Sequence, residues 1–205
     1  MIQAAQQGNL DSLQLLLQNG RDIKEVGHIC LSRRKHNSII SNVIGAAAYH
    51  GNAKVLKFVI SRLGRDSYEQ VNLPALESQD IRPLKTGPFS PEFESYTPLM
   101  LAICSEHGSL EVIKELLKAG ANFKVHEKVS GDNIIHLSAR YSAKIEIIEY
   151  LVKSLSSDLL FERNLKGETP LSIASNLKNT KMTKLLEDLQ ISFDRTRQKA
   201  GDLLA

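Results

Sequence analysis

Apolar residues between positions 98 and 117 recur with the spacing of two short helices. Thr97 precedes Pro98, and this pair predicts a helix start because the threonine hydroxyl can accept from a first-turn N–H while proline occupies N1. Gly120 can adopt the left-handed conformation that ends a second helix. That second helix would bury one apolar face, formed by Val112, Ile113, Leu116 and Leu117. The pattern therefore predicts a unit of helix, turn, helix and loop.

Similar patterns lie on both sides of this unit. Asn42, Asn133 and Thr169 stand where Thr97 stands, each before a short apolar segment. Thr97 and Asn133, and likewise Asn133 and Thr169, are 36 positions apart. A fixed period indicates a repeat protein, in which each unit buries its apolar face against its neighbours. The predicted repeats are approximately 1–23, 41–64, 96–123, 132–155 and 168–189.

The central unit resembles an ankyrin repeat. The matching positions are Thr97-Pro98-Leu99, Ala102, Gly108, Leu110-Glu111-Val112-Ile113, Leu116-Leu117 and Gly120-Ala121-Asn122, with two more residues before Gly108 than the family pattern has. The resemblance implies an all-α solenoid of stacked helix-turn-helix units over residues 1–189, with a long loop insertion. Leu99, Leu116 and Leu117 are expected in its core, together with Ile135, Ile148 and Leu151.

Two segments interrupt the repeats, 24–40 and 65–95. The first contains the basic run Ser32-Arg33-Arg34-Lys35-His36, which predicts a solvated loop or short hairpin rather than core. The second holds four of the six prolines and cannot be helical throughout. It also stretches the interval from Asn42 to Thr97 to 55 residues, against about 33 in the family. Residues 190–205 are mainly polar and are expected to form a capping or linker helix.

Composition narrows the class of protein. No apolar run is long enough to span a membrane, and the amino terminus lacks the pattern of a signal peptide. Two cysteines are too few for a disulfide framework, which favours the cytoplasm or nucleus. A net charge of +3 does not by itself indicate a nucleic-acid or membrane partner. Because the first repeat lacks its Thr-Pro position, we expect either a blunt cap or a piece of a longer protein.

The sequence contains no recognisable catalytic motif. HExxH, GxGxxG, the phosphate-binding loop, GxSxG and the EF-hand pattern are all missing. His28, Cys30 and His36 are three residue types that can bind zinc, but a fourth ligand is lacking and the spacing fits no common module. Cys104 and His107 lack an orienting third residue. We therefore expect a non-enzymatic protein without cofactor or metal.

The resemblance implies a concave surface that binds another protein. This surface would be formed by the first helix of each repeat and by the loop tips between repeats. Tyrosine and arginine there often carry interface energy, although Tyr49 and Tyr141 could instead lean on the neighbouring helix. His136 matches a family histidine that bonds loop backbone and is structural. The expected solvent-facing positions are Tyr49, His50, Cys104, Ser105, Arg140, Tyr141, Ser175 and Asn176 on helices, and Glu94, Ser95, Tyr96, Ser130, Asp132, Lys166 and Glu168 at tips.

The function expected from these observations is protein–protein interaction by a monomeric scaffold or adaptor. The partner is expected to be a peptide or a folded domain, without a membrane. Two alternatives remain open at this stage. The repeats could be a regulatory segment of a larger enzyme or channel, or the basic run 33–36 could bind nucleic acid or phosphate. The run Arg195, Arg197 and Lys199 is ambiguous in the same way.

Overall fold

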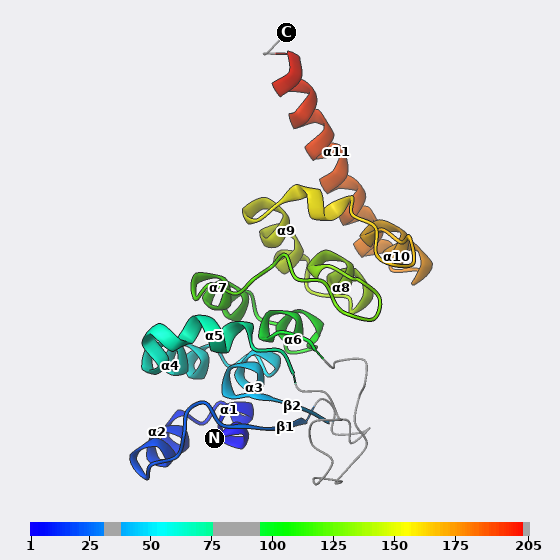
Figure 1. Ribbon diagram of the computed structural model, residues 1–205. Coiled ribbons are helices and arrows are strands. Elements are labelled where there is room, and N and C mark those ends of the chain that lie inside the picture. The colour runs from blue at the N-terminus through cyan, green and yellow to red at the C-terminus, as the bar shows by residue number, and fades with distance from the viewer. Residues whose placement is uncertain (31–37, 76–94, 203–205) are drawn as a thin grey trace. The chain divides into compact units, whose positions relative to one another are not determined.

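The computed structural model describes residues 1–30, 38–75 and 95–202, and the chain forms two compact units (Figure 1). The first unit spans Met1–Phe123 and the second Lys124–Ala205. Each unit has its own buried apolar residues. They are therefore described separately.

Within its described residues, the first unit contains three helix pairs. The first helices of the pairs, α1, α3 and α6, lie side by side, and α4 packs against α7 (Figure 1). Apolar side chains that are fully buried between them include Leu13, Ile44, Leu56, Leu99 and Leu116. The pairs are α1 (Ile2–Gln7) with α2 (Leu10–Gln18), α3 (Val43–Tyr49) with α4 (Ala53–Leu63), and α6 (Pro98–Cys104) with α7 (Leu110–Lys118).

The helix starts predicted at Thr97 and Asn42 are confirmed. Thr97 Oγ1 accepts from the Met100 N–H at 3.4 Å, and Pro98 is the first residue of α6. Asn42 Oδ1 accepts from the Gly45 N–H at 2.8 Å. Both side chains satisfy a backbone donor that the first turn of a helix leaves without a partner.

A β-hairpin departs from the all-α prediction. Strands β1 (Val26–Cys30) and β2 (Ser38–Asn42) pair antiparallel, with His28 opposite Ile40. Hairpin formation agrees with the sequence, but Ile29, Ile39 and Ile40 are buried, so the expectation that the segment stays out of the core is wrong. Ile39 and Ile40 are consecutive on β2, so their side chains point to opposite faces of the strand, and both faces are covered. The basic run 33–36 lies outside the described residues.

Strand β2 continues directly into α3, and their junction is tight. A Cβ at Gly45 would overlap Ser41 Oγ. Glycine therefore stands here, one turn into the helix, where the equivalent residue of α8 is His136. The close approach explains why this position departs from the family pattern.

The start of the 65–95 insertion is helical and partly buried. A short 3-10 turn, η1 (Gly64–Asp66), leads into α5 (Ser67–Asn72), which buries Gln70 and Val71. Asn72 accepts from the Asn122 N–H at 2.7 Å and donates to the Gly120 carbonyl at 3.1 Å. This part of the insertion is therefore joined to the repeats, and residues 76–94 lie outside the described residues.

The second unit contains α8 (Ile134–Arg140), α9 (Ile145–Ser154), α10 (Pro170–Asn176) and α11 (Thr180–Asp202), with a 3-10 turn, η4 (Ser157–Leu160), after α9. Helices α8 and α10 pack side by side, and α10 packs on α11 (Figure 1). Their shared core includes Ile135, Ile148, Leu151, Leu160 and Leu186. Asn133 and Thr169 cap α8 and α10, as the sequence predicted.

Helix α11 runs without a break past residue 189, where the sequence suggested a boundary. Gln190 Nε2 donates to the Leu160 carbonyl at 3.2 Å. The Phe193 ring lies 5.6 Å from the Phe161 ring, centroid to centroid. Residues just beyond 189 therefore continue to contact the second unit.

Candidate functional site

Four predicted contact residues gather at the ends of α3 and α6 in the first unit. Tyr49, Cys104 and Ser105 are buried, with exposed fractions of 7%, 8% and 7%, so the prediction that they face solvent is wrong. The Ser105 hydroxyl donates to the Tyr49 carbonyl oxygen and accepts from the His107 N–H. The turn that carries the two extra residues is thus attached to the preceding repeat, and this attachment buries the predicted positions.

His50 lies at the edge of this cluster and is half-buried. Its ring packs edge-on against Tyr49, with centroids 5.3 Å apart, and lies 6.0 Å from the ring of the exposed His107. Burial, and secondarily the proximity of His107, lowers the pKa of His50. Nε2 of His50 has no hydrogen-bond partner among the described residues. A neutral imidazole is therefore favoured at this position.

Tyr96 is also buried rather than presented at a tip. Only 3% of it is exposed, and its carbonyl accepts from the Ala75 N–H at 2.9 Å. Ser95 beside it has a left-handed backbone, with φ 71°. Glu94, the third residue predicted at this tip, lies outside the described residues.

The second unit brings three predicted residues together, namely Asp132, Arg140 and Glu168. Asp132 Oδ2 accepts from Arg140 Nε at 2.8 Å, and Arg140 Nη2 lies 3.4 Å from Glu168 Oε2. Asn164, which the sequence analysis missed, donates to Asp132 Oδ1 at 2.7 Å and to Glu168 Oε2 at 3.1 Å. These four side chains connect the loop before α8 to the loop before α10.

The ionisable groups of this cluster favour their charged forms. Burial alone would raise the pKa of Asp132, but hydrogen bonds from Arg140 and Asn164 outweigh it and lower that pKa. The hydrogen bond from Asn164, followed by that from Arg140, lowers the pKa of Glu168. Because Asp132 is fully buried, it is not a solvent-facing tip residue as predicted. The cluster braces the loops, and only Arg140 and Glu168 keep partial exposure.

His136 confirms its predicted structural role. Its Nδ1 accepts from the Asn133 N–H at 3.3 Å, so the ring hydrogen is on Nε2, which donates to the Glu168 carbonyl at 2.9 Å. Burial lowers the pKa of His136. A neutral ring therefore bridges the start of α8 and the loop before α10.

The side chains that remain accessible in the second unit are partly those predicted. Ser175, Asn176 and Lys166 are exposed, whereas Tyr141 and Ser130 are half-buried. Sequence reasoning missed Val129 and Leu165, which are 77% and 76% exposed at two successive loop tips. Val129 follows Lys128, and Leu165 precedes Lys166. An aliphatic residue in such a polar loop was the sequence signal that could have identified these two positions. These two tips are the most exposed apolar positions described.

The two tips lie next to each other. The Leu165 N–H donates to the Ser130 carbonyl at 2.9 Å. Gly131 has φ 70°, and a Cβ on it would come within 2.7 Å of Leu165 Cγ. Glycine thus allows the second loop to approach the first, so two exposed apolar residues lie on adjacent loops. We call this pair, Val129 and Leu165, the tip patch.

The described residues contain neither a cluster of metal ligands nor a membrane-spanning helix. Within 1–30, 38–75 and 95–202, no three His, Cys, Asp or Glu side chains are placed to hold a metal ion. His36, one of the three residues considered for zinc, falls outside these ranges. No helix in the described part of the chain combines the length and apolar character needed to cross a bilayer.

The repeated helix pairs correspond to a known family. A family model of ankyrin repeats in three copies matches residues 1–127 and 99–197. The chain belongs to the ankyrin repeat family. Ankyrin repeat protein L271 of Acanthamoeba polyphaga mimivirus is 23% identical over 208 aligned positions, which cover 88% of this chain. The chain spans about 28% of the length of that relative.

Proposed function

We propose that this ankyrin repeat protein is a non-enzymatic module that binds another protein through the tip patch and the neighbouring ends of α8 and α10. Ankyrin repeats generally mediate protein–protein interactions, and typical members are not enzymes. The observation that carries the specific proposal is the high exposure of Val129 and Leu165 on adjacent loops. Large apolar side chains that are exposed together mark interaction sites in soluble proteins.

The surroundings of the tip patch support this role. Arg140, Glu168, Asn164 and Asp132 hold the two loops together, so the patch needs little ordering when a partner binds, which favours affinity. Lys128, Arg163 and Lys166 are exposed around it. Glu127 is buried, where its carboxylate accepts from the Ser130 hydroxyl at 2.6 Å. A partner that is apolar at its centre and acidic at its edge would complement this arrangement.

A photo-crosslinking amino acid at position 165 tests the site in a lysate of the organism that encodes the protein. We expect it to crosslink a specific protein, identified by mass spectrometry. The control position is 177, because Leu177 is 52% exposed at the opposite end of α10. Equal crosslinking of the same protein from both positions would argue against the tip patch.

Titration with the identified partner then measures the contribution of the patch. Combined Val129→Ser and Leu165→Ser substitutions should weaken binding by about tenfold or more, because they remove an apolar centre. Leu177→Ser is the matched control and should leave the dissociation constant within about twofold. An unchanged dissociation constant for the double variant, with an unchanged melting temperature, would refute the proposal.

A second candidate function is regulation within a longer protein. It is favoured by one observation, that the chain spans about 28% of its mimivirus relative. Intact-mass measurement of the native protein distinguishes a free module from a segment of an enzyme or channel. A native mass matching 22.8 kDa would exclude this second candidate.

The oligomeric state and the cellular compartment of the protein are also proposals. We infer a monomer in the cytoplasm or nucleus, since two cysteines in 205 residues fit a reducing compartment. Sedimentation and cell fractionation are the corresponding measurements. A stable dimer at micromolar concentration, or recovery with secreted proteins, would contradict these inferences.

A further inference from the structure

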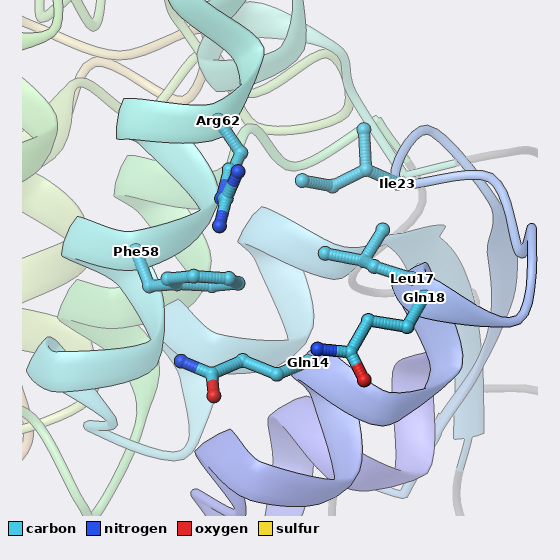
Figure 2. A pocket seen from close by; sticks show the side chains of 6 residues that line it. All are labelled: Gln14, Leu17, Gln18, Ile23, Phe58 and Arg62. Carbon is cyan, nitrogen blue, oxygen red and sulfur yellow. The ribbon is translucent and has the colours of Figure 1, made fainter.

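A hollow lies between α2 and α4 in the first unit, on different helices from the Tyr49 and Ser105 cluster (Figure 2). Its volume is about 460 Å³, within the usual range for sites that hold a ligand. The side chains that line it belong to α2, to the turn that follows α2, and to α4. They are Gln14, Leu17, Gln18, Ile23, Phe58 and Arg62.

The hollow exists because α2 is incompletely covered. Among the residues of this helix only Leu13 is fully buried, whereas Leu16 and Leu17 are half-buried and Leu15 is 59% exposed. On the other side, Phe58 of α4 is also only half-buried. Leu17, Ile23 and Phe58 therefore form an apolar wall that remains open to solvent, and burying such surface would favour binding.

One cation lies over this wall. The Arg62 guanidinium carbon is 5.3 Å from the centroid of the Phe58 ring, and Figure 2 shows Arg62 above that ring on the α4 side of the hollow. Stacking on an aromatic ring orients a guanidinium while leaving its N–H groups available. Arg62 thus combines a fixed position with N–H donors that bond no other residue in the described part of the chain.

The neighbouring cations differ from Arg62 in their partners. Lys24 pairs with Asp66 at 2.7 Å, and Arg21 pairs with Glu25 at 3.1 Å. No carboxylate of the described residues lies within 4.0 Å of the Arg62 guanidinium. Asp66 and Glu25 are therefore already paired, and Arg62 is the one charged side chain among the six that line the hollow.

Two amides complete the lining. Gln14 and Gln18 are one turn apart on α2, and Figure 2 shows both extending toward α4. Neither side chain makes a hydrogen bond to another described residue. An amide offers both a donor and an acceptor, which suits the N–H and C=O groups of a peptide backbone.

From this arrangement we propose that the hollow binds a segment of a partner protein in which a large apolar side chain stands next to an aspartate or glutamate. The apolar side chain packs between Leu17, Ile23 and Phe58. The carboxylate pairs with Arg62, and the two glutamine amides bond the backbone. This site uses other helices than the tip patch and does not depend on it.

Titration of the isotopically labelled full chain by NMR tests the proposal with three six-residue peptides. The first is acetyl-Gly-Ser-Phe-Glu-Ser-Gly-amide, and the others replace its Glu by Gln or its Phe by Ala. We expect the first peptide to shift the resonances of Ile23, Phe58 and Arg62. Either replacement should weaken binding by about tenfold, because each removes a charged hydrogen bond or an apolar contact.

Substitution of Arg62 tests whether the hollow recognises the carboxylate of the peptide or only its apolar side chain. Arg62→Gln should abolish the preference for the Glu peptide over the Gln peptide. The matched control is Arg65→Gln, one turn further along and exposed outside the hollow, which should keep the preference. Melting curves of both variants verify that the fold is retained.

Four outcomes would overturn the proposal. Three of them are equal binding of the Glu and Gln peptides, resonance shifts confined to residues outside the hollow, and no binding at millimolar peptide. A fourth is a concentration dependence of the same resonances without peptide, which would identify a second copy of this chain as the occupant. Because the readout is local to the first unit, none of these outcomes bears on the tip patch.

Discussion

Leu116 and Leu117 are adjacent residues of α7 that differ in burial. Leu116 is 0% exposed, whereas Leu117 is half-buried; both were expected in the core. Leu116→Ala should therefore lower the free energy of unfolding by about 2–5 kcal/mol, because it removes apolar contacts and leaves a cavity. Leu117→Ala should cost only about 1 kcal/mol, since water already reaches its side chain.

Urea denaturation followed by circular dichroism measures both variants. The pair is well matched because the two substitutions are chemically identical and one residue apart, so helix propensity changes equally. Equal costs for Leu116→Ala and Leu117→Ala would mean that the inferred difference in burial is wrong.

His136 should make the stability of the protein depend on pH. Burial lowers its pKa below the ordinary value of 6.5, so the unfolded state takes up a proton at a higher pH than the folded state. The free energy of unfolding should then fall as pH drops below 6.5, until the pH reaches the folded-state pKa. His50, whose pKa is also lowered, should contribute in the same direction.

Denaturation at pH 7.5 and 5.5 checks this expectation. His136→Gln should reduce the difference between the two pH values, at a cost of about 1 kcal/mol at pH 7.5 for the lost hydrogen bond. Combining it with His50→Gln should reduce the difference further. A pH dependence that persists unchanged in the double variant would assign it to other groups.

At the scale of elements, the α3 and α6 ends show why predicted contact residues became buried. Helical period correctly places Tyr49, Cys104 and Ser105 near the ends of first helices. It does not show that the Ser105 hydroxyl bonds the Tyr49 carbonyl, because that contact joins residues 56 positions apart. The prediction failed where a turn between helices folded back on the preceding repeat.

Helix α11 provides a prediction at the same scale. We infer that its second half caps the second unit, with Phe193 packed against Phe161 at 5.6 Å. Phe193→Ala should lower the free energy of unfolding by about 1–2 kcal/mol, through lost apolar burial and ring contact. Ile191→Ala is the control, because Ile191 is 49% exposed and should change stability by less than about 0.5 kcal/mol.

Thermal melts of the two variants provide the comparison. If Phe193→Ala proved as mild as Ile191→Ala, the second half of α11 would be a linker with no capping role. Loss of helix signal beyond that of the parent protein would instead indicate that Phe193 holds the helix itself.

For the whole molecule, the division into two compact units predicts local responses. Leu116 lies in Met1–Phe123 and Leu151 in Lys124–Ala205, and both are fully buried. Repeat proteins are stabilised by contacts between near neighbours. Leu116→Ala should therefore speed amide hydrogen exchange mainly in the first unit, and Leu151→Ala mainly in the second, by about tenfold or more.

Mass spectrometry of peptic fragments measures this exchange. Comparable acceleration in both units for either variant would show that they open together as one cooperative body. The two variants serve as controls for each other, because each creates the same kind of cavity in a different unit.

Local sequence patterns predicted much of the fold. Thr97, Asn42, Asn133 and Thr169 located four helix starts, because capping depends on residues three positions apart. The burial of Ile29 and Ile39 and the helix α5 were missed, since both arise from packing against the adjoining repeats, which local periodicity does not show. The tip patch was missed because the repeat pattern that was matched does not include Val129 or Leu165 among its positions.

The two asparagine caps have a consequence for redesign. Besides capping α3, Asn42 donates through Nδ2 to the Gln70 carbonyl at 2.7 Å. Asn133 likewise donates to the Leu159 carbonyl at 3.0 Å. A threonine hydroxyl at either position could cap the helix but lacks the second arm that reaches the following connection.

Consensus design, which usually stabilises repeat proteins, should therefore fail at these two positions. Asn42→Thr and Asn133→Thr should each lower the free energy of unfolding by about 1–2 kcal/mol, whereas Thr97→Asn should be nearly neutral. Chemical denaturation of the three variants measures these free energies. A gain in stability from either Asn→Thr substitution would refute the proposed second role of the asparagine caps. At both positions, the residue that departs from the family pattern also donates a hydrogen bond to the connection that follows its helix pair.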